Sequence, residues 1–258
     1  MVSFEVIGNK EKAIAITEST GNKKKDKEQA KKICEKAKNV RSVLIKTSKR
    51  KGRLRKREYK LVLGNKDTEV LHKEHGYIIK VDPQVTYFSP RELTERQRIA
   101  EQVKKNEKVL VMFSGIGPFI IAIKKRQHSS SVYGIELNKK AHQYSLENIK
   151  LNRLTNVELI QGDVNKKVPL LKEKFDRIIM PLPKTANKFL NLAFSKIKKN
   201  GIIHYYTWGK KDEDANIKNV INAIAEQNKK KIRIIKIKRV LPYAPKIYKL
   251  AIDIKCLN

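Results

Sequence analysis

Cysteine, tryptophan and acidic residues are scarce in this sequence of 258 residues. The two cysteines, Cys34 and Cys256, lie far apart, which argues against a disulfide framework or a cysteine-based zinc site and fits a reducing cytoplasm. The longest apolar stretch, residues 109–123, is interrupted by glycine, serine and proline and is too short to span a bilayer. No basic segment followed by an apolar one marks a secretory signal, so we expect a soluble, cytoplasmic protein.

The shortage of acidic residues leaves a large positive charge. Lysine and arginine number 59 against 26 aspartates and glutamates, a formal net charge of +33. Such a surplus indicates a polyanionic partner, with nucleic acid as the first expectation and an anionic membrane as the second. A lysine-rich surface adapted to heat or salt is the alternative that needs no partner. Apolar residues make up 40% of the chain, enough for a hydrophobic core.

Part of this charge is concentrated in residues 46–57, where eight of twelve residues are basic. A hairpin tip needs no such charge density to be soluble, so we expect this segment to contact phosphates. The residues predicted to bind RNA are Lys49, Arg50, Lys51, Arg53, Arg55, Lys56 and Arg57.

The pattern of apolar residues divides the chain in two. Short strand-like runs and one polar helix, over residues 27–38, predict a small basic α+β domain in residues 1–82. In residues 83–258 strands alternate regularly with helices, which predicts an α/β domain with a doubly wound, mostly parallel sheet. The last two strands have no helix between them, so we expect an antiparallel pair at one end.

Three helices of the second domain can be predicted more closely. Ser89, Pro90 and Glu92 have the spacing of a capping box, so a helix is expected from Pro90 to about Val103. Further along, a helix is expected over residues 168–173 and another over residues 186–198.

Four successive strands of the predicted sheet end in residues suited to a ligand. The first is followed by the turn Ser114-Gly-Ile-Gly117, the second ends at Glu136, the third is followed by Asp163 and the fourth by Pro181. Open parallel sheets bind ligands at the carboxyl ends of their strands. A carboxylate at Glu136 suits the two hydroxyls of a ribose, and one at Asp163 suits the exocyclic amine of adenine. Ordinary turn and capping chemistry explains any one of these residues, but it explains all four in this order less well.

At these residues the sequence resembles the class I S-adenosylmethionine-dependent methyltransferases and, within them, the archaeal and eukaryotic tRNA guanine-37 N1-methyltransferases. The resemblance covers roughly residues 75–258 and is carried by segments 87–98, 112–119, 135–138, 148–152, 180–186 and 243–248. It implies a seven-stranded, Rossmann-like sheet and S-adenosylmethionine as cofactor. The residues that it assigns to the cofactor are Tyr87, Arg96, Phe113, Gly115, Gly117, Glu136, Leu137, Asp163, Val164 and Pro181. Val111 and Pro181 stand where this family often has an acid and an asparagine.

Methyl transfer to guanine N1 must remove a proton while negative charge builds on O6. Glu95 and Arg91 are four residues apart on one face of the expected helix. The hypothesis is that Glu95 is the general base and that Arg91 steadies O6, roles that the resemblance supports. The alternative is a helix with ordinary Arg91–Glu95 and Glu92–Arg96 ion pairs.

The resemblance also implies tRNA, at its anticodon stem-loop, as the partner, and we expect a monomeric enzyme that uses no metal. His72, Glu74 and His75 are too few for a metal centre. Three other functions stay open: methylation of a tricyclic wybutosine-type intermediate at position 37, transfer of an aminocarboxypropyl group, and RNA binding without catalysis.

Overall fold

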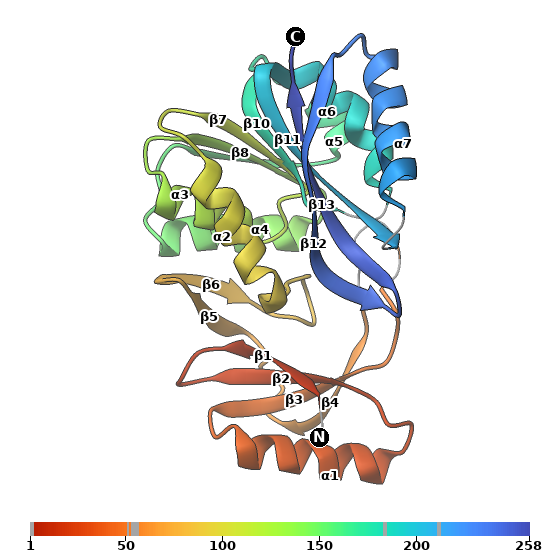
Figure 1. Cartoon of the computed structure of the whole chain (residues 1–258). Helices are drawn as coiled ribbons and strands as arrows, with labels where there is room; N and C mark the ends of the chain where they lie inside the picture. Colours follow the sequence, from red (N-terminus) through yellow and green to blue (C-terminus); the bar gives the residue numbers. More distant parts are fainter. Residues whose placement is uncertain (1–2, 51, 53–56, 183–184, 211–212) are drawn as a thin grey trace.

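The computed structural model describes residues 3–50, 52, 57–182, 185–210 and 213–258, and Figure 1 shows their arrangement. The N-terminal sheet and its helix consist of β1 (Phe4–Gly8), β2 (Ala13–Glu18), α1 (Lys23–Lys36), β3 (Val40–Lys46) and β4 (Tyr59–Gly64). A hairpin follows, made of β5 (Val70–Glu74) and β6 (Tyr77–Val81).

The larger part of the chain forms one mixed sheet with its helices. Its first half contains η1 (Pro90–Glu92), α2 (Leu93–Gln102), β7 (Lys108–Met112), α3 (Pro118–Arg126), β8 (Ser131–Glu136), α4 (Lys139–Leu151), β9 (Val157–Gln161) and α5 (Val164–Lys167). Its second half contains β10 (Phe175–Met180), η2 (Ala186–Phe189), α6 (Leu190–Lys196), β11 (Ile197–Lys210), α7 (Asp214–Gln227), β12 (Ile232–Ala244) and β13 (Ile247–Cys256).

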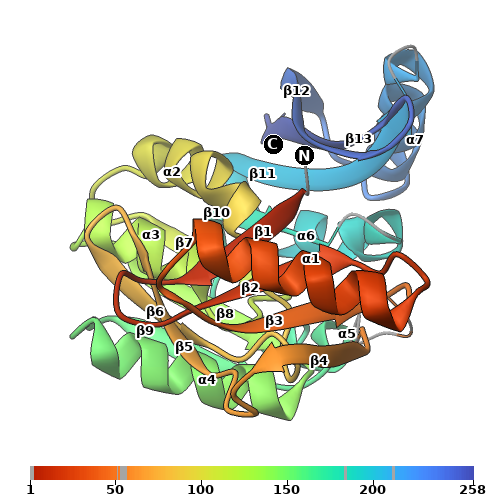
Figure 2. The same ribbon diagram turned by 90° about the horizontal axis from the view of Figure 1, so that it is seen from below.

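The N-terminal sheet has the strand order β1-β2-β3-β4, with α1 connecting the parallel pair β2 and β3. Its strand β2 is buried on both faces. Ala13 and Ala15 pack with Ile33 of α1, whereas Ile14 and Ile16 belong to the core shared with the rest of the molecule. Helix α1 therefore covers the outer face of this sheet, as Figures 1 and 2 show.

Two asparagines attach the β5–β6 hairpin to α4. The Ile78 N–H donates to Asn152 Oδ1 at 3.1 Å, and the Lys80 N–H donates to Asn148 Oδ1 at 2.6 Å. In turn, the Asn148 side-chain amide donates to the Lys80 carbonyl and the Asn152 side-chain amide donates to the Ile78 carbonyl. The hairpin thus connects the N-terminal sheet to the large sheet, and the domain division at residue 82 stays a prediction.

The large sheet has the order β12-β13-β11-β10-β7-β8-β9. Strands β9, β8, β7, β10 and β11 are parallel, and β13 pairs antiparallel with both β11 and β12. The predicted doubly wound sheet and its antiparallel end are therefore confirmed. The chain moves outward from β7 to β9 and then returns to β10 on the other side of β7, so the strand order switches between β7 and β10.

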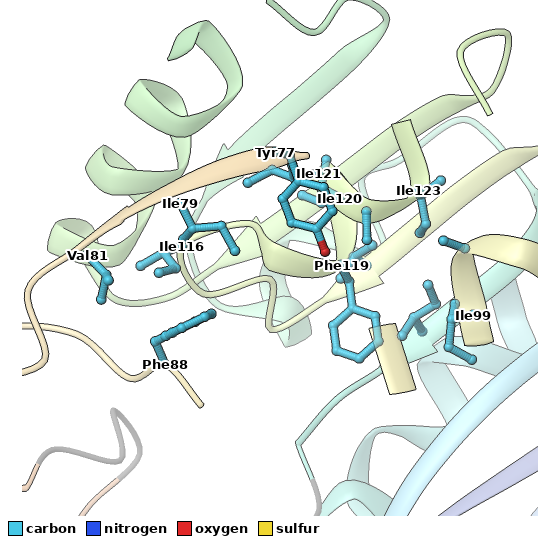
Figure 3. Close-up of a cluster of buried hydrophobic side chains, with 14 of the residues drawn as sticks. Tyr77, Ile79, Val81, Phe88, Ile99, Ile116, Phe119, Ile120, Ile121 and Ile123 are labelled. Atoms are coloured by element: carbon cyan, nitrogen blue, oxygen red, sulfur yellow. The ribbon is translucent and has the colours of Figure 1, made fainter. Parts of the chain in front are cut away.

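Both faces of this sheet are buried, as the alternation along β7 shows. Val109 and Val111 belong to a cluster with Ile99 of α2 and Phe119 of α3 (Figure 3), whereas Leu110 and Met112 pack with residues of α6 and α7. Figures 1 and 2 show α2 and α3 on one side of the sheet and α6 and α7 on the other. Among the described residues, no helix has the length and apolar character needed to cross a membrane.

The capping box predicted at Ser89 is wrong. The Ser89 side chain makes no capping hydrogen bond, and residues Pro90–Glu92 form a 3-10 turn before α2 begins at Leu93. Glu92 does not fold back on the chain because its carboxylate is hydrogen-bonded to Tyr87 and Lys249.

Two further helices differ from their predicted bounds. The helix expected over residues 168–173 lies instead at Val164–Lys167, because the Asp163 side chain accepts the Asn165 N–H and starts it earlier. Pro169 then prevents its continuation. The helix expected over residues 186–198 is divided into η2 and α6 and ends at Lys196.

Candidate active site

A cavity of about 450 Å³ lies at the carboxyl ends of β7, β8, β9 and β10, where the strand order switches. It is lined by Gly52, Tyr87, Phe88, Ser89, Glu92, Arg96, Phe113, Ser114, Gly115, Ile116, Pro118, Phe119, Glu136, Leu137, Asn138, Ala141, Gly162, Asp163, Val164, Pro181, Leu182, Thr185 and Phe189. Every residue predicted to bind the cofactor lines it except Gly117, and both neighbours of Gly117 in sequence do.

The loop between β7 and α3 has a backbone that requires glycine. Gly115 has φ +58° and Gly117 has φ +86°, both in the left-handed region. A Cβ atom on Gly117 would lie 2.8 Å from Ser145 Oγ of α4, so a side chain there would also disturb packing. Phe113, which opens the loop, has φ +60°, a strained conformation for a residue with a side chain. At the end of β7, the shape of the cavity wall is therefore determined by the conformation of the main chain.

Glu136 ends β8, and the backbone holds its carboxylate in place. The Gly115 N–H donates to Oε2 at 2.8 Å and the Asn138 N–H donates to Oε1 at 2.7 Å. Burial raises the pKa of this carboxyl, although the backbone hydrogen bonds oppose the shift. Each carboxylate oxygen has a second lone pair, so Glu136 can accept two more hydrogen bonds from a ligand.

The third and fourth strand ends complete the cavity. Asp163 caps α5 by accepting the Asn165 N–H at 3.0 Å. On the side of β10, Phe113 packs edge-on against Phe189, with ring centroids 4.9 Å apart, and Pro181 lies beside this pair in the cavity wall. Residues 183 and 184, which follow Pro181 and Leu182 in the sequence, lie outside the described residues.

A carboxylate that sequence reasoning had not assigned to the site, Glu92, lines the opposite wall. The Tyr87 hydroxyl donates to its Oε1 at 3.1 Å and the Lys249 ammonium donates to its Oε2 at 2.7 Å. Burial favours a higher pKa for this carboxyl, but the charge and hydrogen bond of Lys249 outweigh it, so its pKa lies below the ordinary value. Residues 249–254 are all buried, and Lys249 and Asp253 are the charged residues among them. A buried lysine is stable only when a carboxylate such as that of Glu92 pairs with it.

Glu95, the predicted base, is 2% exposed and is not among the residues that line the cavity. The Arg98 guanidinium donates to both of its oxygens, at 2.8 and 2.7 Å, and the Tyr206 hydroxyl donates to Oε1 at 2.6 Å. Lys238 lies 3.8 Å from Oε2. Burial and the neighbouring Glu95 charge raise the pKa of Tyr206 well above its ordinary value, so this hydroxyl keeps its proton.

The ion pairs of the alternative interpretation, Arg91–Glu95 and Glu92–Arg96, are not found among the described residues, whose ion pairs involve other partners. Arg91 is nearly half exposed, and its Nη1 lies 3.9 Å from Glu5 Oε1 in β1. Arg96 is 2% exposed and donates to the Glu74 carboxylate and to the Ser89 carbonyl. Because α2 begins only at Leu93, Arg91 does not share a helical face with Glu95.

The basic segment of the N-terminal domain reaches the same cavity. The Arg50 guanidinium lies over the Tyr87 ring, 4.2 Å from its centroid, and Gly52 lines the cavity. Lys49 is exposed and Arg57 is half-buried. The remaining predicted RNA-binding residues, Lys51, Arg53, Arg55 and Lys56, lie outside the described residues.

The histidines beside Glu74 have other contacts. His72 Nδ1 lies 3.1 Å from the Gly8 backbone nitrogen, and its Nε2 lies 3.4 Å from Glu74 Oε1. In the part of the chain that the structure describes, no three histidine, cysteine, aspartate or glutamate side chains are grouped as a metal site would require.

Residues 70–235 match the family model of the TRM5/TYW2 methyltransferase domain. The chain is 38% identical over 255 residues to the tRNA (guanine(37)-N(1))-methyltransferase Trm5b of Pyrococcus abyssi, covering 98% of this chain and 74% of that protein. The crystal structure of that protein superimposes with a TM-score of 0.88 and covers 99% of this chain and 75% of its own. The chain belongs to the TRM5/TYW2 methyltransferase family.

The chain is also similar to a second curated relative and to a second solved structure. The tRNA(Phe) (4-demethylwyosine(37)-C(7)) aminocarboxypropyltransferase of Methanocaldococcus jannaschii is 36% identical over 216 residues, covering 83% of this chain and 86% of that one. The structure of M. jannaschii TYW2 in complex with AdoMet is 28% identical, with a TM-score of 0.75, and covers 99% of this chain and 100% of that one. The resemblance stated from sequence is confirmed at the level of the family.

In this TRM5/TYW2 methyltransferase, every residue that lines the cavity except Gly52 lies within the matched residues 70–235. Gly52 comes from the N-terminal domain, and Lys249, which holds Glu92, comes from the last strand. Sequence reasoning missed Glu92 because its spacing from Ser89 also fits a helix cap. The available signal was Lys249, a basic residue within an apolar strand.

Proposed function

We propose that this chain transfers a methyl group from S-adenosylmethionine to N1 of guanosine 37 of tRNA. The observation that carries the proposal is the cavity at the strand switch point, with the glycine turn, Glu136 and Asp163 on its walls. It is supported by 38% identity to an enzyme named for this reaction, over 98% of the chain.

The residues of the cavity fit the proposed cofactor. Glu136 has lone pairs available for two ribose hydroxyls. The hydrogen bonds from the Gly115 and Asn138 N–H groups fix the carboxylate, so these lone pairs have a defined direction. Asp163 is the proposed acceptor for the adenine amine, and the apolar residues Leu137 and Val164 line the same cavity. Tyr87, Arg96, Phe113 and Pro181, with the main chain at Gly115 and Gly117, form the remaining proposed contacts. S-adenosylmethionine supplies a methyl group on a positively charged sulfur that is its own leaving group.

The protein must then remove the N1 proton of guanine, and two carboxylates are candidates. Glu95 remains the proposed base, with Arg91 proposed to steady O6. Glu92 is the second candidate because its carboxylate lines the cavity, whereas that of Glu95 is held by Arg98 and Tyr206. A base acts only within hydrogen-bond reach of the proton. Glu95 therefore needs the acceptor guanine to enter from the side of Tyr206 and Lys238, beyond the described cavity.

The proposed RNA partner is the anticodon stem-loop of tRNA, held by Lys49, Arg50, Lys51, Arg53, Arg55, Lys56 and Arg57. The described part of this segment supports the assignment because Arg50 and Gly52 lie at the cavity. RNA is most easily read at unpaired loops such as this one. We also propose a monomer that acts in the cytoplasm and uses no metal.

A double-label assay tests the reaction class. The enzyme is incubated with a tRNA transcript that carries guanosine 37 and with S-adenosylmethionine labelled either in its methyl or in its carboxyl group. Only the methyl label should pass to the RNA. Transfer of the carboxyl label would indicate aminocarboxypropyl transfer, and RNA binding without either label would indicate a non-catalytic protein. Activity only on tRNA that already contains the tricyclic base would favour the wybutosine-type alternative.

A further inference from the structure

Trp208 and Tyr243 form a stacked aromatic pair at the surface. Their ring centroids are 4.1 Å apart with an interplanar angle of 30°. Trp208, on β11, is half-buried, while Tyr243, on β12, is 64% exposed. One exposed ring is ordinary on a protein surface. Here, however, the inner ring fixes the orientation of the outer one, so a flat aromatic face is presented to solvent.

The register of the sheet places this pair beside the proposed active site. Trp208 is directly opposite Lys249 in the antiparallel β11–β13 ladder, so both side chains point to the same face of the sheet. The Lys249 ammonium reaches Glu92 on the cavity wall at 2.7 Å. Tyr206, two residues before Trp208 and therefore on the same face, donates its hydroxyl to Glu95. Trp208 thus lies on the sheet face whose side chains, Tyr206 and Lys249, hold the two candidate bases.

The surroundings of the pair are positively charged. In the turn after β12 Lys246 is exposed, and on β12 Lys238 is 35% exposed. Lys210, at the end of β11, is 64% exposed, and its ion pair with Glu213 is long at 3.9 Å. Figure 1 shows the β12–β13 hairpin extending from the large sheet toward the N-terminal domain. An aromatic face among cations is complementary to a nucleobase with its phosphates.

We propose that the Trp208–Tyr243 pair is a stacking platform for one unpaired RNA base next to the purine that is methylated. Single-stranded nucleic acids bind by stacking bases on aromatic side chains while basic residues contact the backbone. Tyr243 would carry the base, Trp208 would hold Tyr243 in place, and Lys210 and Lys246 would contact the adjoining phosphates. The proposal rests on the proposed function, since it specifies how that RNA substrate is held.

The sole tryptophan of the chain makes the test direct. Trp208 fluorescence is recorded while the full-length protein is titrated with an anticodon stem-loop RNA or with a blunt RNA duplex of equal length. The loop RNA should quench Trp208 and the duplex should not. Tyr243→Ala should weaken loop binding and raise the KM for tRNA, each by roughly 5- to 100-fold. Tyr243→Phe, which keeps the ring, should retain most of the affinity.

Ile235→Ala is the matched control, because Ile235 is 51% exposed on the same strand but far from the pair along it. It should leave loop binding unchanged. The platform is refuted if Tyr243→Ala methylates tRNA with the wild-type KM or if the duplex quenches Trp208 fluorescence as strongly as the loop RNA. It is also refuted if anionic lipid vesicles quench Trp208 fluorescence and the loop RNA does not. Methylation by the wild-type protein is measured in parallel. Its absence would overturn the proposed function, whereas normal methylation with an unaffected Tyr243→Ala variant would overturn the platform alone.

Discussion

The carboxylate of Glu136 accepts one backbone N–H on each oxygen, and this arrangement specifies what a substitution there does. In Glu136→Gln the amide NH₂ would face a backbone N–H donor, either from Gly115 or from Asn138, and one acceptor for the ribose would be lost. We expect S-adenosylmethionine affinity to fall by roughly 10- to 100-fold, measured by calorimetry. Glu158→Gln, an exposed substitution on β9, is the control. Equal affinities in the two variants would contradict the assignment of Glu136.

The two candidate bases can be separated by single-turnover kinetics. Glu92→Gln and Glu95→Gln are compared at saturating cofactor, with Glu101→Gln, an exposed change on the same helix, as the control. The variant that lacks the base should methylate roughly 10²- to 10⁴-fold more slowly while still binding cofactor. We expect this loss for Glu95→Gln. A large loss confined to Glu92→Gln would transfer the role to the residue on the cavity wall, and unchanged rates in both would remove both from the mechanism.

Some of these residues could be predicted from sequence and others could not, for a physical reason. Glu136 and Asp163 were predicted to share a site because each ends a parallel strand, and the ends of parallel strands meet at one edge of the sheet. The partnership of Glu92 with Lys249 joins residues 157 positions apart. Neither local spacing nor helix propensity indicates a contact of that kind.

Between elements, a buried polar network connects α2 to the antiparallel strands. The Arg98 guanidinium joins Glu95 to Asp253 of β13, and His204 of β11 lies with Nδ1 2.6 Å from Asp253 Oδ1. The other His204 nitrogen, Nε2, lies 2.6 Å from the Arg177 guanidinium, so it must accept a hydrogen bond and Nδ1 must donate one. Burial lowers the pKa of His204, in keeping with a neutral ring. The network fixes α2, which contains Glu95 and directly follows Glu92, against the sheet.

Asp253 makes this network sensitive to acid. Burial favours a higher pKa for its carboxyl, but the hydrogen bonds from His204 and Arg98 outweigh it and hold the pKa well below the ordinary value. Its contribution to stability is therefore present above the unfolded pKa of about 3.9 and is lost as pH falls toward the folded value. Asp253→Asn should lower the free energy of unfolding by about 3 kcal/mol at pH 7.

Urea unfolding at a series of pH values checks this. The difference between wild type and Asp253→Asn should be constant from pH 7 to about pH 5 and should shrink below about pH 4. A difference that grows toward low pH would mean that Asp253 is not stabilised as an anion.

The order and type of the elements followed from the sequence, but their ends did not. Alternating apolar strands and helices predicted the parallel sheet, because that pattern has few other solutions. The predicted helix boundaries were wrong where a side chain could form a hydrogen bond with more than one partner. Glu92 pairs with the distant Lys249 and does not cap the helix start. Asp163 caps a helix that the apolar pattern had placed four residues later.

For the molecule as a whole, the docking of the N-terminal sheet was not predictable. The sequence shows four consecutive apolar residues, 13–16, in β2 but does not say what covers the second face of this strand. In the structure Ile14 and Ile16 pack toward the hairpin and the large sheet. That docking brings Arg50 and Gly52 to the cavity, so the basic segment and the proposed catalytic site form one surface.

The net charge of +33 predicts RNA binding that depends steeply on salt. In the double variant Lys49→Ala/Arg50→Ala, the slope of log K against log salt should become shallower by roughly 1.4 to 1.8, the loss of two phosphate contacts. Lys31→Ala/Lys32→Ala removes the same charge from exposed positions on α1, at the outer face of the N-terminal sheet, and is the matched control. If both pairs change the slope equally, net charge rather than the basic segment determines binding.

Nucleoside mass spectrometry is the most direct measurement of what this TRM5/TYW2 methyltransferase does. A tRNA transcript with guanosine 37 is incubated with the protein and S-adenosylmethionine, digested and mapped, beside a transcript that carries adenosine 37. We predict N1-methylguanosine at position 37 of the first transcript and no modification of the second. An unmodified guanosine 37, an aminocarboxypropyl adduct, or a methyl group at another position would contradict the proposed function.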